Sequence, residues 1–151
     1  MNIRVSAKAI IIQDGRLLAI QKRDPAGDYY ILPGGGQNPG ETLHQTLQRE
    51  CMEEASVVVI PGELRFVREY IGRHHKFTAW DGEAHQLELM FTCLMPAGAH
   101  PRQGGLPDED QTGVAWLPLE RLDEFRLYPL SLIPHLMRPG EKEPVYLGDV
   151  N

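Results

Sequence analysis

Cysteine is scarce in this sequence: Cys51 and Cys93 are the two cysteines among 151 residues. They follow no disulfide framework, and the chain has no CxxC or HExxH spacing that would indicate a zinc site. A buried cysteine behaves as a small hydrophobic residue. We therefore expect two inert core thiols in a protein of a reducing compartment, which favours the cytoplasm.

Long apolar runs are also missing. The runs at residues 9–12 and 57–60 are far shorter than the roughly 20 residues that cross a bilayer. The N-terminus lacks the pattern of a secretory signal. We expect no association with a membrane.

Positive charge is in deficit. Fifteen Lys and Arg residues face 21 Asp and Glu residues, which gives a net charge of −6. General nucleic-acid binding depends on basic patches. The charge balance therefore argues against a protein that binds nucleic acid in general.

Apolar runs separated by turn residues are present over most of the chain, and they predict the fold. We expect strands at residues 3–12, 17–21, 29–32, 57–60, 64–71, 86–95 and 114–117. Helices are expected at 42–55, after Pro118, and at 131–137. This order predicts an α/β/α sandwich with a mixed β-sheet between helices. Residues 1–138 are expected to form one domain, with 139–151 as a surface tail.

The stretch at residues 34–57 combines a glycine-rich loop with an acidic helix. Thr42 and Gln45 have the spacing of a capping box. At about 100° per residue, Glu50, Glu53 and Glu54 fall within roughly one third of the helix circumference. An apolar stripe beside them is formed by Leu43, Leu47, Cys51 and Ala55.

Three like charges so close together repel each other, and a cation would reverse that balance. Carboxylate oxygens are hard ligands that suit Mg²⁺, Mn²⁺ or Ca²⁺. The alternative is a solvated helix face in which Arg49 and Glu53 form an ordinary i, i+4 pair. The glycine loop upstream favours the site, because it can bring backbone groups close to the acids.

The same stretch resembles the Nudix box, G-x5-E-x7-R-E-U-x-E-E-x-G-U with U an aliphatic residue. The matching residues are Gly35, Glu41, Arg49, Glu50, Glu53, Glu54 and Val57, preceded by Leu32-Pro33-Gly34. Two positions depart from the pattern, since Cys51 replaces an aliphatic residue and Ser56 replaces a glycine. If position 56 needs a left-handed backbone, serine there costs about 1 kcal/mol.

The resemblance implies a MutT-like Nudix hydrolase that cleaves a pyrophosphate bond in a nucleotide. It implies Mg²⁺, with Mn²⁺ as an alternative, held by Glu50, Glu54 and the Gly34 carbonyl. Glu53 would be a further ligand or the catalytic base. Glu41 and Arg49 would fix the loop and the helix.

Substrate contacts are expected from several other residues. In the family, a basic residue at the place of Arg23 often faces phosphates, and Gly35 belongs to the same loop. Glu109 or Asp110, before the last strand, could add a ligand or a base. Trp80 could stack on a nucleobase. For each side chain an ordinary surface or core role stays open.

The alternative function is a catalytically silent Nudix-like module that binds a nucleotide and regulates a partner. A purely structural role for the acids is a third reading. The expected partner is a small nucleotide, which is left open between a nucleoside di- or triphosphate and a nucleoside diphosphate linked to another group. A homodimer is left open as well.

Overall fold

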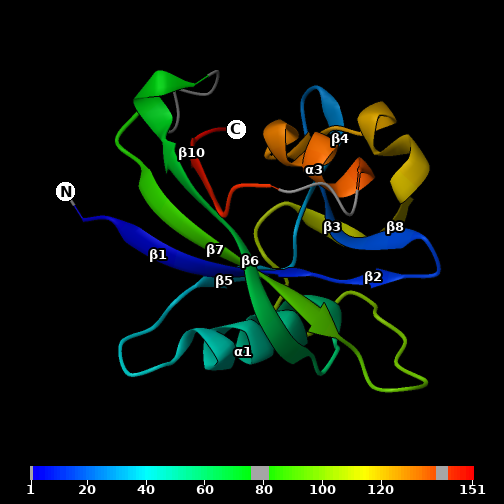
Figure 1. Ribbon diagram of the computed structural model, residues 1–151. Coiled ribbons are helices and arrows are strands. Elements are labelled where there is room, and N and C mark those ends of the chain that lie inside the picture. Colours follow the sequence, from blue (N-terminus) through cyan, green and yellow to red (C-terminus); the bar gives the residue numbers. More distant parts are fainter. Residues whose placement is uncertain (1, 76–81, 139–142) are drawn as a thin grey trace.

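The computed structural model describes residues 2–75, 82–138 and 143–151. Within these residues the chain forms two five-stranded sheets (Figure 1). None of the helices within these ranges is long and apolar enough to cross a membrane.

The first sheet is mixed and carries the glycine-rich loop at one edge. Its strands, in spatial order, are β10 (Tyr146–Asp149), β6 (Ile60–Ile71), β7 (His85–Leu94), β1 (Arg4–Ile10) and β5 (Gly34–Gly36). β1 runs parallel to β7, and β10 runs parallel to β6. β5 pairs antiparallel with β1 and places Gly34 opposite Lys8 and Gly36 opposite Ser6.

The second sheet is built around the long strand β3. Its strands are β2 (Ile12–Gln13), β3 (Arg16–Asp24), β4 (Gly27–Ile31), β9 (Leu127–Tyr128) and β8 (Gln111–Pro118). β2 and β3 form the hairpin that the Asp14-Gly15 dipeptide predicts, and both turn residues have positive φ, 52° and 72°. Such values suit the twist of the two strands.

Helices cover the sheets from two sides. α1 (Leu43–Ala55) packs against β1 and β5, and it lies opposite α3 (Ile133–Met137) in Figure 1. The described residues also form three short 3₁₀ helices, η1 (Gly72–His74), η2 (Leu119–Glu124) and η3 (Leu130–Leu132). The sandwich fold that the sequence predicts is confirmed, with its strands divided between two mixed sheets.

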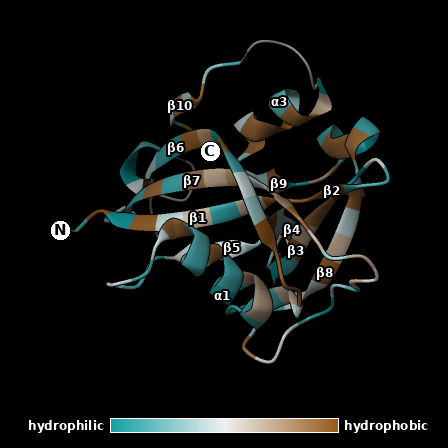
Figure 2. Ribbon diagram, turned by 60° about the horizontal axis from the view of Figure 1, so that its bottom comes forward, coloured by the Kyte–Doolittle hydropathy of each residue, from teal (hydrophilic) through white to brown (hydrophobic). Residues whose placement is uncertain are grey.

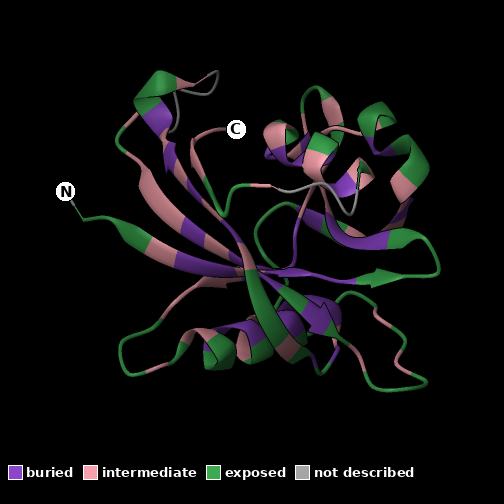
Figure 3. Cartoon of the chain, viewed as in Figure 1, coloured by how far each residue is buried: buried purple, intermediate pink, exposed green. Residues whose placement is uncertain are grey.

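The core follows from the two-residue period of the strands. On β1, Ala7 and Ala9 pack with α1, whereas Ile10 packs with η2, η3 and α3. The side chains of β3 alternate in the same way, since Leu18 packs in the cluster on the α1 side and Leu17 packs in the other cluster. Such strands are buried on both faces, and buried residues accordingly concentrate where the two sheets meet (Figure 3).

The α1 helix begins and ends as its sequence predicts. The Thr42 hydroxyl accepts from the Gln45 amide at 3.1 Å, and the Thr42 amide donates to Gln45 Oε1 at 2.8 Å. At the other end, Ser56 has φ 52° and ψ 37°, a left-handed backbone, and its amide donates to the Met52 carbonyl. The side of α1 visible in Figure 2 is largely hydrophilic, because its apolar stripe faces the sheet.

Two expectations about local structure were wrong, for residues 57–59 and for the end of the chain. Residues 57–59 form no strand, although Val57 and Val59 are buried, because the chain leaves α1 through a left-handed turn and packs there without a strand partner. The helix expected after Pro118 is present, as a 3₁₀ helix. The end of the chain is not only a surface tail, because Tyr146–Asp149 pairs with β6.

Candidate active site

The glycine loop and α1 meet because β5 crosses closely over β1. Gly34 has a φ of +136°, and a Cβ added to it would lie 2.1 Å from the Ala7 carbonyl oxygen. Only glycine tolerates this conformation and this contact. The backbone of Gly34 is thereby brought to the C-terminal half of α1.

Glu54 is the buried acid of this site, with 2% of its surface exposed. The Gly34 amide donates to its Oε1 at 2.9 Å. Burial raises the pKa of the Glu54 carboxyl to about 7, although the nearby Lys8 charge and the Gly34 hydrogen bond act in the opposite direction. Within the described ranges, Glu54 forms no ion pair at hydrogen-bonding distance.

Glu50 lies against the backbone of Gly35. A Cβ added to Gly35 would be 2.6 Å from the Glu50 carboxyl carbon. Arg49 Nη1 donates to Glu50 Oε1 at 2.8 Å. The position of this carboxylate therefore depends on a glycine on one side and an arginine on the other.

Arg49 connects the loop, the helix start and the acidic face. Its Nε and Nη2 donate to the two oxygens of Glu41 at 2.6 and 3.0 Å, and Nη2 also donates to the Gly36 carbonyl at 2.9 Å. The Arg49 bond and the Asn38 amide lower the pKa of Glu41 to about 2. A planar guanidinium that binds a carboxylate through two nitrogens holds both groups in place.

A pocket of about 120 Å³ lies between β1, β5 and α1. It is lined by Arg4, Ser6, Lys8, Gly34, Gly35, Glu50, Glu54, Gln86 and Asp108. Four of the predicted site residues, Gly34, Gly35, Glu50 and Glu54, are thus brought together. Glu53 does not line this pocket, and it contacts Arg49 at 3.4 Å.

Lys8 belongs to this site and was missed by the sequence analysis. Its Nζ lies 3.4 Å from the carbonyl oxygens of both Leu32 and Gly34. The only sequence signal was its place in the β1 run, where every second residue faces the same side. A lysine at an alternate position of a buried strand can be recognised as a pocket residue only when the neighbouring strand is known.

The acidic loop at residues 108–110 contributes Asp108 to the pocket, and not Glu109 or Asp110 as the sequence predicts. Asp108 lines the pocket and accepts from Lys22 Nζ at 3.0 Å, whereas Glu109 and Asp110 are exposed and do not line it. Gln111 anchors this loop, because its Nε2 donates to the Glu54 carbonyl at 2.8 Å.

Two predicted substrate contacts lie elsewhere. Arg23 is exposed at the end of β3 and donates to Asp28 Oδ1 at 2.9 Å. It does not line the pocket with Glu50 and Glu54. Trp80 lies outside the described residues.

The donors around the pocket fit a hard divalent ion. In the described part of the chain, no three histidine, cysteine or acidic side chains are arranged to hold a metal ion together. The pocket is nevertheless lined by three carboxylates, of which Glu50 and Glu54 lie on α1 beside the backbone of Gly34 and Asp108 is paired with Lys22. These are oxygen donors of the kind that Mg²⁺ and Mn²⁺ prefer.

Solved structures with the same fold are numerous. A NUDIX hydrolase from Nitrosomonas europaea superposes with a TM-score of 0.71 at 19% identity, covering 95% of this chain and 94% of the other. An ADP-ribose pyrophosphatase from Streptococcus suis has a TM-score of 0.63 at 17% identity, with 96% and 99% covered. A MutT NUDIX hydrolase from Burkholderia pseudomallei has a TM-score of 0.61 at 27% identity, with 80% and 86% covered.

A comparison with curated proteins found no match. The family model of the NUDIX domain matches residues 2–136. That match spans the glycine loop, α1 with its acids, and every strand of the two sheets except β10. The chain therefore belongs to the Nudix family of pyrophosphohydrolases.

Proposed function

We propose that this protein hydrolyses a pyrophosphate bond in a nucleoside di- or triphosphate, or in a nucleoside diphosphate linked to another group, with Mg²⁺ or Mn²⁺ as cofactor. The observation that carries the proposal is the position of Glu50, Glu54 and Gly34 around one pocket. Nudix hydrolases generally use divalent metals and act on small nucleotide-like substrates.

The burial of Glu54 favours a functional role over a purely structural one. An acid that serves only the fold would be paired with a cation or exposed to water. Among the described residues Glu54 has no direct ion pair, it is buried, and burial raises its pKa to about 7. A perturbed acid in a pocket is typical of catalytic and metal-binding sites.

In this proposal Glu50, Glu54 and the Gly34 carbonyl would hold the metal. When bound, the ion neutralises phosphate charge and lowers the pKa of bound water. Arg49 and Glu41 keep the acidic face in place, as their hydrogen bonds support. Asp108, close to Lys22 at the other side of the pocket, is a candidate proton acceptor.

The substrate assay uses the whole chain with Mg²⁺ and a panel of nucleoside di- and triphosphates, nucleoside diphosphate sugars and dinucleoside polyphosphates. Phosphate release is measured, and mass spectrometry of products formed in ¹⁸O water shows which phosphorus is attacked. We expect Glu54→Gln to lose activity by about 100-fold or more, as expected when a metal ligand and its charge are removed. Equal rates for the wild type and Glu54→Gln would sink the assignment.

Glu53→Gln is the matched control, because it makes the same chemical change one residue earlier on the same helix. Glu53 does not line the pocket, so we expect a smaller loss than for Glu54→Gln. The silent-module alternative makes a different prediction: nucleotides would bind across the panel with no turnover of any of them.

A further inference from the structure

Three alternate residues of β1, Arg4, Ser6 and Lys8, line the same side of the pocket. Residues i, i+2 and i+4 of a strand share one face. The strand next to them offers only glycines, since Gly36 lies opposite Ser6 and Gly34 opposite Lys8. β5 therefore places no side chain beside these β1 residues, and the Arg4 guanidinium occupies the position that a side chain at Gly36 would take.

The Ser6 hydroxyl has no hydrogen-bond partner among the described residues, although only 2% of the residue is exposed. A hydroxyl can donate one hydrogen bond and accept two. Buried polar groups are rarely left without a partner, and an orphan in a pocket indicates a ligand or water that completes it. Because Ser6 lines the pocket, its missing partner belongs there.

The two cations that flank Ser6 interact with Glu54 and Glu88 through their charge but form no direct ion pair with an acid of the described residues. In the described part of the chain, Arg4 and Lys8 form no ion pair, and the Lys8 ammonium contacts only backbone carbonyls, at 3.4 Å. The Arg4 guanidinium lies over Gly36, where an added Cβ would be 2.7 Å from its Nε.

Three of the acids near these cations already accept from a different side chain, whereas Glu54, whose pKa the Lys8 charge acts to lower, accepts from the Gly34 amide. Glu88, which pairs with Ser6 in the β1–β7 ladder, accepts from Arg68 Nε at 2.6 Å. Glu50 accepts from Arg49 at 2.8 Å, and Asp108 accepts from Lys22 at 3.0 Å. The β1 side of the pocket thus presents two unpaired cations and one unused hydroxyl.

We propose that Arg4, Ser6 and Lys8 form a phosphate-binding subsite that holds one phosphate group of the substrate beside Glu50 and Glu54. Arginine and lysine bind phosphate oxygens through charge-assisted hydrogen bonds, and a hydroxyl adds a third donor. The pocket measures about 120 Å³, below the roughly 300–1,000 Å³ of sites that enclose a whole ligand. Its size suits one phosphate group.

The identity of the ligand as a nucleotide phosphate rests on the proposed function, but the anion site itself can be tested without turnover. Inorganic phosphate is titrated into the ¹⁵N-labelled full chain in EDTA, with sodium chloride matching the ionic strength. We expect saturable shifts of the backbone amides of Ser6, Lys8 and Gly36. Because these shifts are measured on the wild-type protein, they test phosphate binding at this site even if a variant fails to fold.

Variants then identify the donors. We expect Arg4→Gln and Lys8→Gln each to weaken phosphate binding about tenfold, and Ser6→Ala about threefold, in line with charged and neutral hydrogen bonds. Arg121→Gln is the control, because Arg121 is exposed on η2, pairs with Glu124 and does not line the pocket. It should leave phosphate binding unchanged.

The absence of saturable shifts at these amides, or equal phosphate affinity in all four variants, would overturn the subsite. Failure of the subsite and failure of the proposed function are distinguishable. Nucleotide hydrolysis with no phosphate binding at β1 overturns only the subsite, whereas phosphate binding at β1 without hydrolysis of any nucleotide overturns only the function. With an active enzyme, Arg4→Gln should raise KM for the nucleotide more than it lowers kcat.

Discussion

Arg49 binds Glu41 through two nitrogens, with Nε 2.6 Å from Oε2 and Nη2 3.0 Å from Oε1. These residues are eight positions apart, one before the helix and one inside it. The same guanidinium reaches Glu50 and the Gly36 carbonyl. A single side chain thus ties the loop to the acidic face.

Replacing Arg49 by lysine should therefore disturb the site more than the charge-preserving change suggests. A lysine cannot present two parallel donors to Glu41. We expect kcat to fall about 10–100-fold and the free energy of unfolding to fall by about 1–3 kcal/mol. Arg121→Lys, at an exposed pair with Glu124, should change neither quantity measurably. An Arg49→Lys enzyme with wild-type kcat would contradict this role.

Gly35→Ala should displace Glu50 without removing any charge. The new Cβ would lie 2.6 Å from the Glu50 carboxyl carbon, so one of them must move. A displacement of about 1 Å in a catalytic group can cost about 100-fold in rate. Gly105→Ala is the control, because nothing lies within 4 Å of a Cβ there. If steady-state rates of the two variants agree, the close packing of Gly35 on Glu50 is not needed for activity.

Binding of Mg²⁺ should stabilise the wild type and fail to stabilise Glu54→Gln. A ligand at 100 times its Kd adds about 2.7 kcal/mol to the free energy of unfolding. For a chain of this length that corresponds to a rise in Tm of about 5–10 °C. Differential scanning fluorimetry with Mg²⁺ and with EDTA measures it. Glu53→Gln should show the same Mg²⁺-induced rise in Tm as the wild type. An equal rise in the wild type, Glu54→Gln and Glu53→Gln would show that Glu54 does not bind the metal.

Ser56→Gly should stabilise the protein at the end of α1. Ser56 has a φ of 52°, where glycine avoids a cost of about 1 kcal/mol. The greater conformational freedom of glycine in the unfolded chain offsets part of this stabilisation. We expect a net increase of about 0.5 kcal/mol, or about 1–2 °C in Tm. Ser56→Ala keeps the left-handed strain and should show no gain. A lower Tm for the glycine variant would contradict this account.

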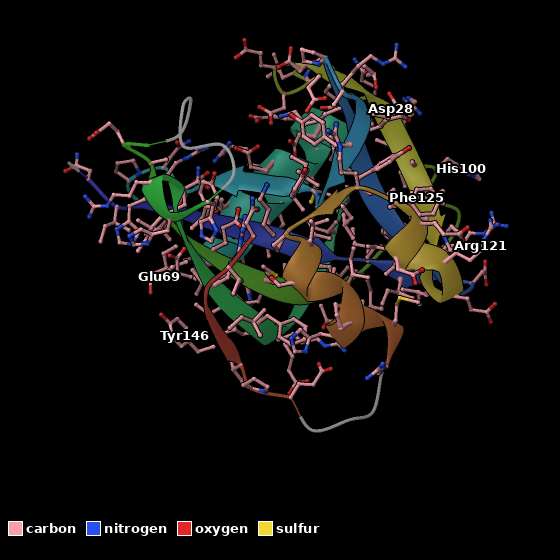
Figure 4. The ribbon with its side chains drawn as sticks, turned by 90° about the horizontal axis from the view of Figure 1, so that it is seen from above. Asp28, Glu69, His100, Arg121, Phe125 and Tyr146 are labelled. Atoms are coloured by element: carbon pink, nitrogen blue, oxygen red, sulfur yellow. The ribbon has the colours of Figure 1, made fainter. Side chains whose placement is uncertain are left out.

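The Asp149 carboxylate holds the C-terminal strand β10 through hydrogen bonds that should weaken when it is protonated in acid. Asp149 lies 2.6 Å from His75 Nε2 and 2.8 Å from His74 Nδ1, and it accepts from the Ile71 amide at 3.0 Å. Burial acts to raise the pKa of Asp149, but these hydrogen bonds outweigh it and lower the pKa to about 2. Nearby on the same strand, Tyr146 donates to Glu69 of β6 (Figure 4).

A carboxyl whose pKa is lower in the folded state stabilises the fold above its unfolded pKa of 3.8. That contribution is lost as the pH falls from about 4 towards 2. We expect Asp149→Asn to cost about 1 kcal/mol at pH 6, after allowance for solvent screening, and progressively less below pH 4. Urea unfolding at several pH values measures the difference, with the exposed Asp123→Asn as control. A difference between wild type and Asp149→Asn that does not change with pH would refute the prediction.

What the sequence determined by itself is local. The capping box at Thr42 and Gln45, the acidic face of α1 and the Asp14-Gly15 turn depend on residues a few positions apart, so composition and spacing predict them. The Nudix pattern is also local, because its residues belong to one loop and the helix that follows it.

Tertiary structure alone decided which distant residues complete the site. Lys8 and Ser6 enter it because β5 crosses β1, and Asp108, not Glu109 or Asp110, lines the pocket because Gln111 anchors its loop to the Glu54 carbonyl. Strand pairing between positions more than 20 residues apart sets these contacts. The pairing depends on the whole core, so no short stretch of sequence could predict it.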